Sequence, residues 1–451
     1  MSQTIAAIAT ASANAGIGVI RISGDEAVIV ADKVFKAASG QKVADMQGYT
    51  AAYGQVFDAD GKVDEAVALR FVAPKSYTGE DVVELSCHGG EYLLRRALRA
   101  VLAAGARMAQ AGEFTRRAFL NGKLDLTAAE SVMNLIGAKG SGAHKAALAA
   151  RNGAVFSAAQ TIKADLISAD ADLAAWTDFP DEDVPYVEAD SLKIKLNKAK
   201  EGLNALISTA ERGKMLTQGV TTAIVGKPNV GKSTVMNLLA GCDRSIVTDI
   251  AGTTRDVIEE SVGVAGYNLI LADTAGIRET EDVIEAVGVE LARKKMEDAQ
   301  LIIGVFDSSR PFDSEDTALM EQMRGRPHIA ILNKCDLPRQ ADITACPITD
   351  FVQISAKFDS AEPIERALET VLGTADLNAE AGIIANDRQL DCVNRAFYAL
   401  QDAVSALEGG FTFDAVGVCI DDAITALCEL TGERASESVV DEVFSRFCVG
   451  K

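Results

Sequence analysis

The segment Gly226-Lys-Pro-Asn-Val-Gly-Lys-Ser233 constrains the fold of this chain more than any other stretch. It has the spacing G-x-x-x-x-G-K-[ST] of a phosphate-binding loop. An apolar run before it, residues 220–225, predicts a buried strand, and residues 233–240 after it predict a helix. A glycine-rich loop before a helix N-terminus offers phosphate oxygens several backbone N–H groups and a positive dipole end. We therefore expect Lys232 to reach the β- and γ-phosphates of a nucleotide and the Ser233 hydroxyl to bind Mg²⁺.

The composition indicates a globular protein of two or three domains, with 451 residues and a hydrophobic content of 48%. The net charge is −21, opposite in sign to that of proteins that grip nucleic acid by its phosphates. Direct RNA contact would therefore need a local patch or a partner. The eight cysteines include no C-x-x-C, which favours reduced thiols in a cytosol over disulfides or a zinc site. No apolar run is long enough to span a bilayer, and the N-terminus lacks the basic region of a signal peptide.

Residues 1–120 mix short β-like runs with turns and predict an α+β domain. Two polar stretches in it, residues 76–90 and 112–125, stand in apolar surroundings and suit a polar cleft. We expect His88 to be a hydrogen-bonded structural histidine, because no catalytic triad or metal-ligand set is evident near it in the sequence. The expected strands are residues 17–23, 65–71 and 81–86.

The pattern becomes helical from Thr127 onward. Thr127-Ala-Ala-Glu130 has the sequence of a capping box and predicts a helix start, and alanine-rich helical sequence continues to about residue 175. The acidic segment 176–185 is expected to be a solvated loop and not a metal site, because it lacks Asp-x-Asp-x-Asp spacing with a glycine. Further helices, which together suggest one helical domain in two parts, are predicted over residues 191–212, 386–407, 414–430 and 437–447.

Residues 218–374 alternate strands with helices and predict a mostly parallel sheet covered on both faces. In such a sheet the ligand binds at the carboxyl ends of the strands, where the loop at Gly226 lies. The expected strands are residues 220–225, 257–264, 267–272, 301–307, 328–333 and 351–355, with a last helix near residues 362–372.

Two motifs in this segment indicate a guanine nucleotide. Asn333-Lys-Cys-Asp336 follows a predicted strand, and the Asp336 carboxylate can accept from both N1–H and the N2 amino group of guanine. Adenine lacks this donor pair and would leave the carboxylate unpaired, which disfavours an ATPase by about 10⁴-fold or more. Ser355-Ala-Lys357, after the last strand, can brace the base from a backbone N–H.

Two further motifs suit the metal and the γ-phosphate. Asp273-Thr-Ala-Gly276 ends a strand, so Asp273 can hold Mg²⁺ through water and the Gly276 N–H can sense the γ-phosphate. Hydroxyls in the segment 248–256 can complete the Mg²⁺ shell, and the segment can become ordered with the γ-phosphate. In Ras-like enzymes a glutamine after Asp-x-x-Gly orients the attacking water. Ile277 occupies that position here and cannot do so, and the sequence assigns no arginine finger.

The chain resembles the MnmE (TrmE) family of bacterial tRNA-modification GTPases over its full length. The specific marks are Gly252-Thr-Thr-Arg-Asp256, Tyr77-Thr-Gly-Glu-Asp81 with His88-Gly-Gly90, Gly112-Glu-Phe with Arg117-Ala-Phe-Leu-Asn121, and Phe447-Cys-Val-Gly-Lys451. The family usually ends Phe-Cys-Ile-Gly-Lys, so Val449 is a departure.

The resemblance implies a multidomain protein. It has an α+β N-terminal folate-binding-like domain that dimerises, an α-helical bundle domain, and a Ras-like α/β P-loop G domain inserted into the bundle. The expected ranges are residues 1–120 for the N-terminal domain, 121–217 and 376–451 for the two parts of the helical domain, and 218–375 for the G domain. With the motifs above, the predicted GTP-binding residues are Asn229, Val230, Gly231, Lys232, Ser233, Thr234, Thr248, Asp249, Ile250, Ala251, Gly252, Thr253, Thr254, Asp273, Thr274, Ala275, Gly276, Asn333, Lys334, Asp336, Ser355, Ala356 and Lys357.

The resemblance also implies that K⁺ acts where other GTPases use an arginine finger, because stabilising developing charge is the main catalytic task. It implies Mg²⁺ at Ser233 and Thr254, and a catalytic set of Glu285, Lys232 and Asn229 in which Glu285 orients water indirectly. The implied K⁺ ligands are Asn229, Thr248, Ile250 and Thr253.

Folate binding carries over by position to Arg21, Glu84, Lys123 and Lys451. Arginine and lysine suit the glutamate tail of a folate, and a carboxylate suits the donor edge of the pterin. The implied donor is a tetrahydrofolate derivative, 5-formyl- or methylene-tetrahydrofolate.

The implied function is a cytoplasmic, homodimeric, K⁺-activated GTPase that acts with the flavoprotein MnmG, which alone carries FAD. Together they would form the 5-carboxymethylaminomethyl or aminomethyl modification of the wobble uridine in certain tRNAs, the tRNA being held mainly through the complex. The alternative is an RNA- or ribosome-binding switch GTPase of the Era or EngA type that acts in assembly. A basic RNA-binding domain would mark that alternative, and the sequence shows none.

Overall fold

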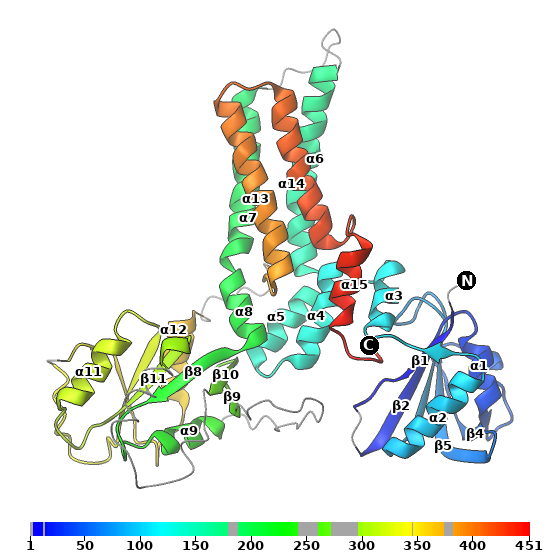
Figure 1. The fold of residues 1–451 in the computed structure, drawn as a ribbon, viewed down its shortest axis with the longest axis horizontal. Coiled ribbons are helices and arrows are strands. Elements are labelled where there is room, and N and C mark those ends of the chain that lie inside the picture. The colour runs from blue at the N-terminus through cyan, green and yellow to red at the C-terminus, as the bar shows by residue number, and fades with distance from the viewer. Residues whose placement is uncertain are drawn as a thin grey trace. The chain divides into compact units, whose positions relative to one another are not determined.

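The computed structural model describes residues 3–11, 14–178, 188–241, 260–271, 296–344, 346–373 and 382–451. The chain forms two compact units, one of Met1–Met133 with Ile424–Lys451 and the other of Asn134–Ala423. Each unit contains its own β-sheet (Figure 1). The domain ranges expected from the sequence stay predictions.

The first unit is built on a seven-stranded sheet of order β3-β4-β5-β6-β2-β1-β7. Neighbouring strands are antiparallel, except for the parallel pair β1–β7. Helices α1 (Ala27–Val34) and α2 (Glu91–Ala103) lie against it (Figure 1), and their Val30 and Leu94 join Ile20 and Leu85 of the sheet in one core. The strands are β1 (Ile5–Ile8), β2 (Ala15–Ser23), β3 (Phe35–Ala37), β4 (Ala51–Asp58), β5 (Gly61–Phe71), β6 (Val82–Gly89) and β7 (Arg107–Met108), and a 3₁₀ turn, η1, covers Val43–Asp45.

A second core in this unit joins residues far apart in the sequence. Helix α3 (Glu113–Leu120) packs on α15 (Glu437–Ser445), with Phe119 and Phe444 ring centroids 6.2 Å apart. The first turns of α4 (Leu126–Gly137) add Leu126 and further apolar side chains to the same core. The C-terminal segment therefore belongs structurally with the N-terminal sheet.

The predicted capping box at Thr127 is wrong by two residues. Helix α4 begins at Leu126, and Oδ1 of Asp125 accepts from the N–H groups of Thr127 (2.9 Å) and Ala128 (3.0 Å). Asp125 is therefore the cap, while Thr127 is buried in the first turn. Aspartate is a stronger N-cap than threonine, so the earlier residue takes the role.

The helical part of the second unit consists of long helices that run side by side (Figure 1). Helix α7 (Ala189–Ser208) packs on α13 (Asp387–Glu408) and on α6 (Ala154–Asp178). Trp176 of α6 meets Phe413 of α14 (Phe413–Thr431) edge to face at 5.2 Å. Most of the acidic segment 176–185 lies outside the described residues.

The second sheet has six strands in the order β13-β12-β11-β8-β10-β9. All neighbours are parallel except the β9–β10 hairpin, which confirms the mostly parallel sheet expected from the sequence. The central strand β11 (Leu301–Asp307) is buried at every residue, as a strand covered on both faces requires. The others are β8 (Val220–Val225), β9 (Glu260–Val264), β10 (Tyr267–Leu271), β12 (His328–Asn333) and β13 (Phe351–Gln353).

Helices cover both faces of this sheet. Helices α9 (Lys232–Ala240) and α12 (Glu362–Leu372) share one core with Ile303 and Val305 of β11. Helix α11 (Ser314–Met323) shares the other core with Ile302 and Phe306. The alternation of neighbouring β11 residues between two cores is the period of two of a strand. This α/β part, the helical part and the α+β N-terminal part confirm the predicted fold class.

Three glycines join the helical part to the β9–β10 hairpin. The Gly142 N–H, in the first turn of α5 (Ser141–Arg151), donates to the Gly266 carbonyl at 3.1 Å. A Cβ on Gly140 would lie 2.5 Å from that same carbonyl oxygen. The joint therefore consists of backbone against backbone, with no room for a side chain at Gly140.

The single helix predicted over residues 191–212 is instead two helices. Helix α7 ends at Ser208, and α8 (Ala210–Gln218) continues to the start of β8. The break is held by Thr209, whose hydroxyl oxygen accepts from the Ile384 N–H at 3.0 Å. The α8 helix thus lies along the segment at Ile384, and it leads directly into the strand before the phosphate-binding loop.

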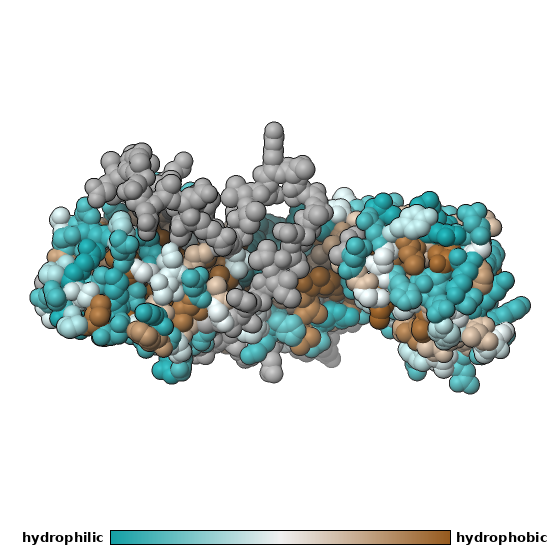
Figure 2. Space-filling model, turned by 90° about the horizontal axis from the view of Figure 1, so that it is seen from below, coloured by the Kyte–Doolittle hydropathy of each residue, from teal (hydrophilic) through white to brown (hydrophobic). Residues whose placement is uncertain are grey.

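The surface of the described residues is mostly hydrophilic on the face shown in Figure 2, with smaller hydrophobic areas between. This accords with a chain in which 24% of residues are charged. None of the described helices is both long enough and apolar enough to cross a membrane.

Two helical glycines in the second unit should respond oppositely to alanine. A Cβ on Gly213 of α8 would lie 1.9 Å from the Ile384 carbonyl oxygen, whereas one on Gly417 of α14 would find ordinary contact at 3.5 Å. Gly213→Ala should lower the unfolding temperature through a clash of about 1–3 kcal/mol. Gly417→Ala should raise it, since alanine favours a helix over glycine by about 0.5–1 kcal/mol. Thermal unfolding of both variants checks this, and a stabilised Gly213→Ala variant would contradict the contact with Ile384.

Candidate functional site

The phosphate-binding loop lies between β8 and α9, as the sequence predicted. Gly226 and Gly231 have φ of +148° and +99°, and Asn229 also has a positive φ of +62°. A Cβ on Gly226 would lie 2.3 Å from the Val305 carbonyl oxygen. The loop therefore needs glycine for both its backbone conformation and its close approach to β11.

Lys232 begins helix α9 with its side chain folded over the loop. Its Nζ donates to the carbonyl oxygens of Gly226 and Lys227, each at 2.7 Å. Burial lowers the pKa of this ammonium group. Ser233 and Thr234 follow it in the first turn of the helix and are exposed. This arrangement places one ammonium group and two hydroxyl-bearing residues at the N-terminal turn of α9, next to the loop.

Asn333, the last residue of β12, joins the loop to the neighbouring segment. Its side chain is only 4% exposed. Nδ2 donates to the Val230 carbonyl at 2.8 Å, and Oδ1 accepts from the Ala356 N–H at 2.9 Å. A Cβ on Gly231 would lie 2.2 Å from Nδ2. One amide therefore holds the three predicted segments 229–234, 333–336 and 355–357 together.

The other residues of these segments lie around that amide. Oδ1 of the exposed Asp336 accepts from the Ser355 hydroxyl at 2.7 Å. Nζ of Lys334 donates to Oδ2 of Asp307 at 2.7 Å, and Nζ of Lys357 lies 5.1 Å from the centroid of the Phe358 ring. Asp336 is thus oriented by a neighbour from the adjacent segment, as a carboxylate that reads a base edge requires.

Many predicted residues lie outside the described part of the chain, so their placement stays a prediction. They are Thr248, Asp249, Ile250, Ala251, Gly252, Thr253, Thr254, Asp273, Thr274, Ala275, Gly276, Ile277 and Glu285.

Lys227, inside the loop, has acidic partners that sequence reasoning missed. Its Nζ contacts the Asp313 carboxylate, and it also lies 3.0 Å from Glu315 and 3.6 Å from Asp316. Asp313 and Asp316 form the capping box of α11, and the hydrogen bond from Lys227 lowers the pKa of Asp313 to about 2. The spacing of Asp313 and Asp316 in the sequence indicates a capping box at the start of α11. It does not indicate that Lys227 of the loop pairs with this cap.

In the first unit, Arg21 is the centre of a second cluster. It faces Glu84 across the β2–β6 pair, and its Nε donates to Glu84 Oε1 at 2.8 Å. Its guanidinium lies 5.3 Å from the Tyr77 ring centroid and 5.6 Å from that of Phe114. An arginine, a carboxylate and two aromatic faces are therefore gathered in one place.

Lys451 joins this cluster through the C-terminal segment. The segment is held by a β-bridge between Ala111 and Val449, and Arg21 Nη1 donates to the Gly450 carbonyl at 3.3 Å. Burial and the charge of Arg21 lower the pKa of Lys451, and the charge of Glu84 opposes them. Nζ of Lys123 instead donates to the Pro74 carbonyl at 3.1 Å. Within the described residues, no hydrogen bond links Lys123 to the other three predicted folate positions.

His88 is hydrogen-bonded, as expected. Its Nδ1 and its backbone N–H each lie 2.8 Å from an oxygen of Asp64 on the neighbouring strand β5. This carboxylate raises the pKa of the imidazole. The contact ties β5 to β6, which is a structural role.

A buried ion network fixes the walls of the Arg21 cluster. Glu113 of α3 accepts from both terminal guanidinium nitrogens of Arg107, from Arg117 Nη2 at 3.0 Å and from the Gln110 N–H at 2.9 Å. Arg117 also contacts Glu80 at 2.9 Å. The network therefore connects α3, which carries Phe114, to the loop that carries Tyr77. The sequence showed these charges as a polar stretch but did not show which of them pair.

Comparisons with known proteins cover the whole chain. Residues 126–448 match the family described as the MnmE helical domain, and residues 4–123 match that described as the GTP-binding protein TrmE N-terminus. The tRNA modification GTPase MnmE of Clostridioides difficile is 38% identical, with 100% of both chains covered. That of Geobacter sulfurreducens is 40% identical, again with 100% of both chains covered. The crystal structure of Era from Aquifex aeolicus is 26% identical over 40% of this chain and 66% of that chain, but its TM-score of 0.24 is too low to bear on function.

The network predicts a specific pH dependence. Burial alone would raise the pKa of Glu113, but the hydrogen bonds from Arg107, the Gln110 N–H and Arg117 outweigh it and lower the pKa to about 2. A carboxyl whose folded pKa lies below its ordinary 4.5 stabilises the fold above that value, and the contribution is lost as the pH falls toward about 2.

We therefore expect Glu113→Gln to destabilise the protein near neutral pH and to differ progressively less from wild type between pH 4.5 and about 2. Urea unfolding of both proteins across this range measures the difference. Glu91→Gln, in an exposed pair with Arg95, is the matched control and should change little. A constant wild-type-to-variant difference across the range would contradict the assigned pKa.

Proposed function

Because this chain belongs to the MnmE family of tRNA modification GTPases, we propose that it acts with the flavoprotein MnmG on the wobble uridine of certain tRNAs. The chain is a GTP hydrolase, and nucleotide and Mg²⁺ binding follow from that class. The proposed product is a 5-carboxymethylaminomethyl or aminomethyl uridine, with the one-carbon unit supplied by a tetrahydrofolate derivative. Nothing in the described part of the fold favours the alternative of an assembly-factor GTPase.

The observation that carries the nucleotide assignment is the buried amide of Asn333. It links the backbone of the phosphate-binding loop to the backbone that follows Ser355. A nucleotide whose phosphates occupy the loop would therefore place its base beside Asp336. The Asp336 carboxylate would accept from the two guanine donors, which distinguishes GTP from ATP.

The loop residues fit the roles proposed for them. Lys232 would exchange its two carbonyl partners for phosphate oxygens. Their negative charge would stabilise the ammonium group and offset the burial that lowers its pKa. The exposed Ser233 hydroxyl would bind Mg²⁺, together with Thr254. Asn229 is exposed at the turn of the loop with its backbone in the left-handed conformation. Its side chain could therefore contribute an oxygen to K⁺, with Thr248, Ile250 and Thr253. Glu285 would orient the attacking water in place of the missing glutamine.

The Arg21 cluster suits a folate. Arg21 and Lys451 offer two cations for the carboxylates of the glutamate tail, and Glu84 offers acceptors for the donor edge of the pterin. The half-buried ring of Tyr77 provides a flat apolar face for a heterocycle, while the fully buried Phe114 supports Arg21 from the core. Lys123 remains a proposed contact and would need to leave the Pro74 carbonyl to take part.

The net charge of the chain and its family indicate which partners it has. A net charge of −21 opposes tRNA phosphates, so MnmG would supply most of the tRNA contact in a heterotetramer built on a homodimer of this chain. We expect the protein in the cytoplasm, where its tRNA substrates are. FAD would be carried by the partner alone.

The proposed K⁺ activation is tested by GTP turnover in KCl against NaCl at equal ionic strength. We expect hydrolysis several-fold faster in KCl, because the ion would replace an arginine finger in stabilising developing charge. Asn229→Ala should remove the K⁺ effect. Asn237→Ala, at an exposed position in α9, is the matched control and should keep it. Equal rates in both salts would argue against the K⁺ mechanism and favour an assembly-factor GTPase.

The proposed folate site makes a separate prediction. Lys451→Ala should weaken binding of 5-formyltetrahydrofolate by about tenfold to a hundredfold, since one charge-assisted hydrogen bond is lost. Lys33→Ala, an exposed lysine of α1, is the control and should bind normally. Calorimetric titration measures both, and unchanged affinity in Lys451→Ala would exclude this lysine from the site. GTP turnover should be normal in both variants. The folate titration can therefore fail while the test of K⁺ activation succeeds, and the reverse.

A further inference from the structure

Ser355 hydrogen-bonds to two carboxylates of the second unit. Its hydroxyl donates to Oδ1 of Asp336 at 2.7 Å, and its backbone N–H donates to Oδ2 of Asp359 at 2.6 Å. Ser355 is only 5% exposed, whereas both aspartates are exposed. Asp336 is a predicted GTP-binding residue, but Asp359 lies two residues beyond the last predicted one, Lys357. The structure therefore connects an aspartate without a predicted role to the residue proposed to bind guanine.

The Asp336 carboxylate depends on Ser355 for its orientation. Within the described part of the chain, the Ser355 hydroxyl is the one hydrogen-bond donor to this carboxylate. The last torsion of an aspartate side chain has a broad energy well, so an exposed carboxylate without a donor rotates readily. A carboxylate that accepts two N–H groups from one base edge must instead be held near the plane of that edge.

Ser355 is itself held on two sides. On one side the next residue, Ala356, donates its N–H to Oδ1 of the buried Asn333 at 2.9 Å. On the other side Asp359 accepts from the Ser355 N–H. The Ser355 carbonyl accepts from the N–H groups of Phe358 and Asp359, each at 2.9 Å. The N–H, the carbonyl and the hydroxyl of Ser355 therefore all have partners.

Loss of the Asp359 carboxylate would break only one of these contacts. The two hydrogen bonds to the Ser355 carbonyl come from the main chain, so they remain possible in an alanine variant. The N–H of the buried Ser355, however, would lose its acceptor, which is costly for a buried backbone group. We therefore expect a turn that still forms but holds Ser355 less firmly.

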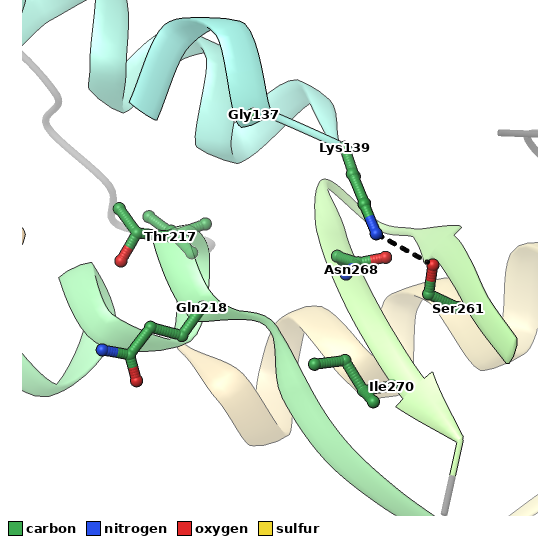
Figure 3. A pocket seen from close by; sticks show the side chains of 8 residues that line it. Gly137, Lys139, Thr217, Gln218, Ser261, Asn268 and Ile270 are labelled. Atoms are coloured by element: carbon green, nitrogen blue, oxygen red, sulfur yellow. Dashed lines mark hydrogen bonds between the residues drawn. The ribbon is translucent and has the colours of Figure 1, made fainter. Parts of the chain in front are cut away.

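A closed cavity does not select the base in place of these contacts. A cavity of about 250 Å³ in the same unit lies between Lys139, Gln218 and the β9–β10 hairpin (Figure 3). Its described lining includes no residue of the segments 333–336 and 355–359. A base beside Asp336 would therefore lie against exposed side chains, and its selection would depend on how well they are oriented.

We propose that Asp359 is a positioning residue for guanine recognition. It holds Ser355 so that the Ser355 hydroxyl orients Asp336 toward the N1–H and the N2 amino group of the base. The inference rests on the proposed contact between Asp336 and guanine. Because the partner of Asp359 is a neutral backbone N–H, an acceptor oxygen is required at this position and a negative charge is not.

The test compares GDP with inosine diphosphate, whose base lacks only the 2-amino group of guanine. Calorimetric titration of the full chain measures both affinities. The wild type should bind GDP about tenfold to a hundredfold more tightly, because Asp336 accepts a charge-assisted hydrogen bond from that amino group. Asp359→Ala should lower this preference by about threefold or more, because a less well oriented carboxylate makes a weaker hydrogen bond. Asp359→Asn keeps an acceptor oxygen and should largely keep the preference.

Asp342→Ala is the matched control. Asp342 is also exposed and accepts from a nearby backbone N–H, that of Thr344, at 2.9 Å. Within the described residues it forms no hydrogen bond to the segments 333–336 and 355–359. Its alanine variant should therefore keep the wild-type preference for GDP.

Three results would overturn the inference alone. One is a wild-type preference retained in Asp359→Ala. Another is an equal weakening of GDP and inosine diphosphate in that variant, complete loss of both included, which would show a merely structural role. The third is a preference lost as fully in Asp359→Asn as in Asp359→Ala. A wild-type chain without a preference for GDP would instead contradict the proposed contact of Asp336 with guanine, and the inference with it.

Discussion

The nucleotide-binding part of this protein depends on one buried side-chain amide, that of Asn333. The loop before α9 presents the Val230 carbonyl to this amide, and the segment after β13 presents the Ala356 N–H to it. Asn333 stands at the end of β12, which hydrogen-bonds to both β11 and β13, so its position is fixed by the sheet. An amide offers a donor and an acceptor together, which few side chains do. Without it, a buried carbonyl and a buried N–H would both lack partners.

In the first unit, charged side chains hold separate segments of the chain together. There the parts to be held are the loop that carries Tyr77 and the helix that carries Phe114. Glu113 holds them together with two arginines, Arg107 and Arg117. Burying ions is costly unless each is paired and hydrogen-bonded, and Glu113 meets that condition with donors from Arg107, Arg117 and the Gln110 N–H. In both units, therefore, buried polar contacts set the positions of exposed functional groups, and the hydrophobic cores only support the elements that carry them.

The sequence was informative where a function needs local backbone chemistry. The loop at Gly226, the strands around it and the segments at Asn333 and Ser355 could be predicted, because glycines and strand ends mark them directly. Pairings between distant residues could not. Nothing in the sequence joins Lys227 to Asp313, or Glu113 to both Arg107 and Arg117, because such partners are chosen by tertiary packing. The cap of α4 shows a smaller limit, since both Asp125 and Thr127 are acceptable caps and only the helix start at Leu126 selects between them.

The glycine joint at Gly140, Gly142 and Gly266 has a consequence for how such proteins diversify. The α/β part meets the helical part there through main-chain atoms, so the contact does not depend on matching side chains. Side-chain interfaces must change on both sides at once, whereas a backbone joint only requires that glycine be kept. An inserted domain attached in this way is interchangeable in principle. A chimera that takes its α/β domain from one relative and its helices from another would keep the glycine joint without compensating substitutions.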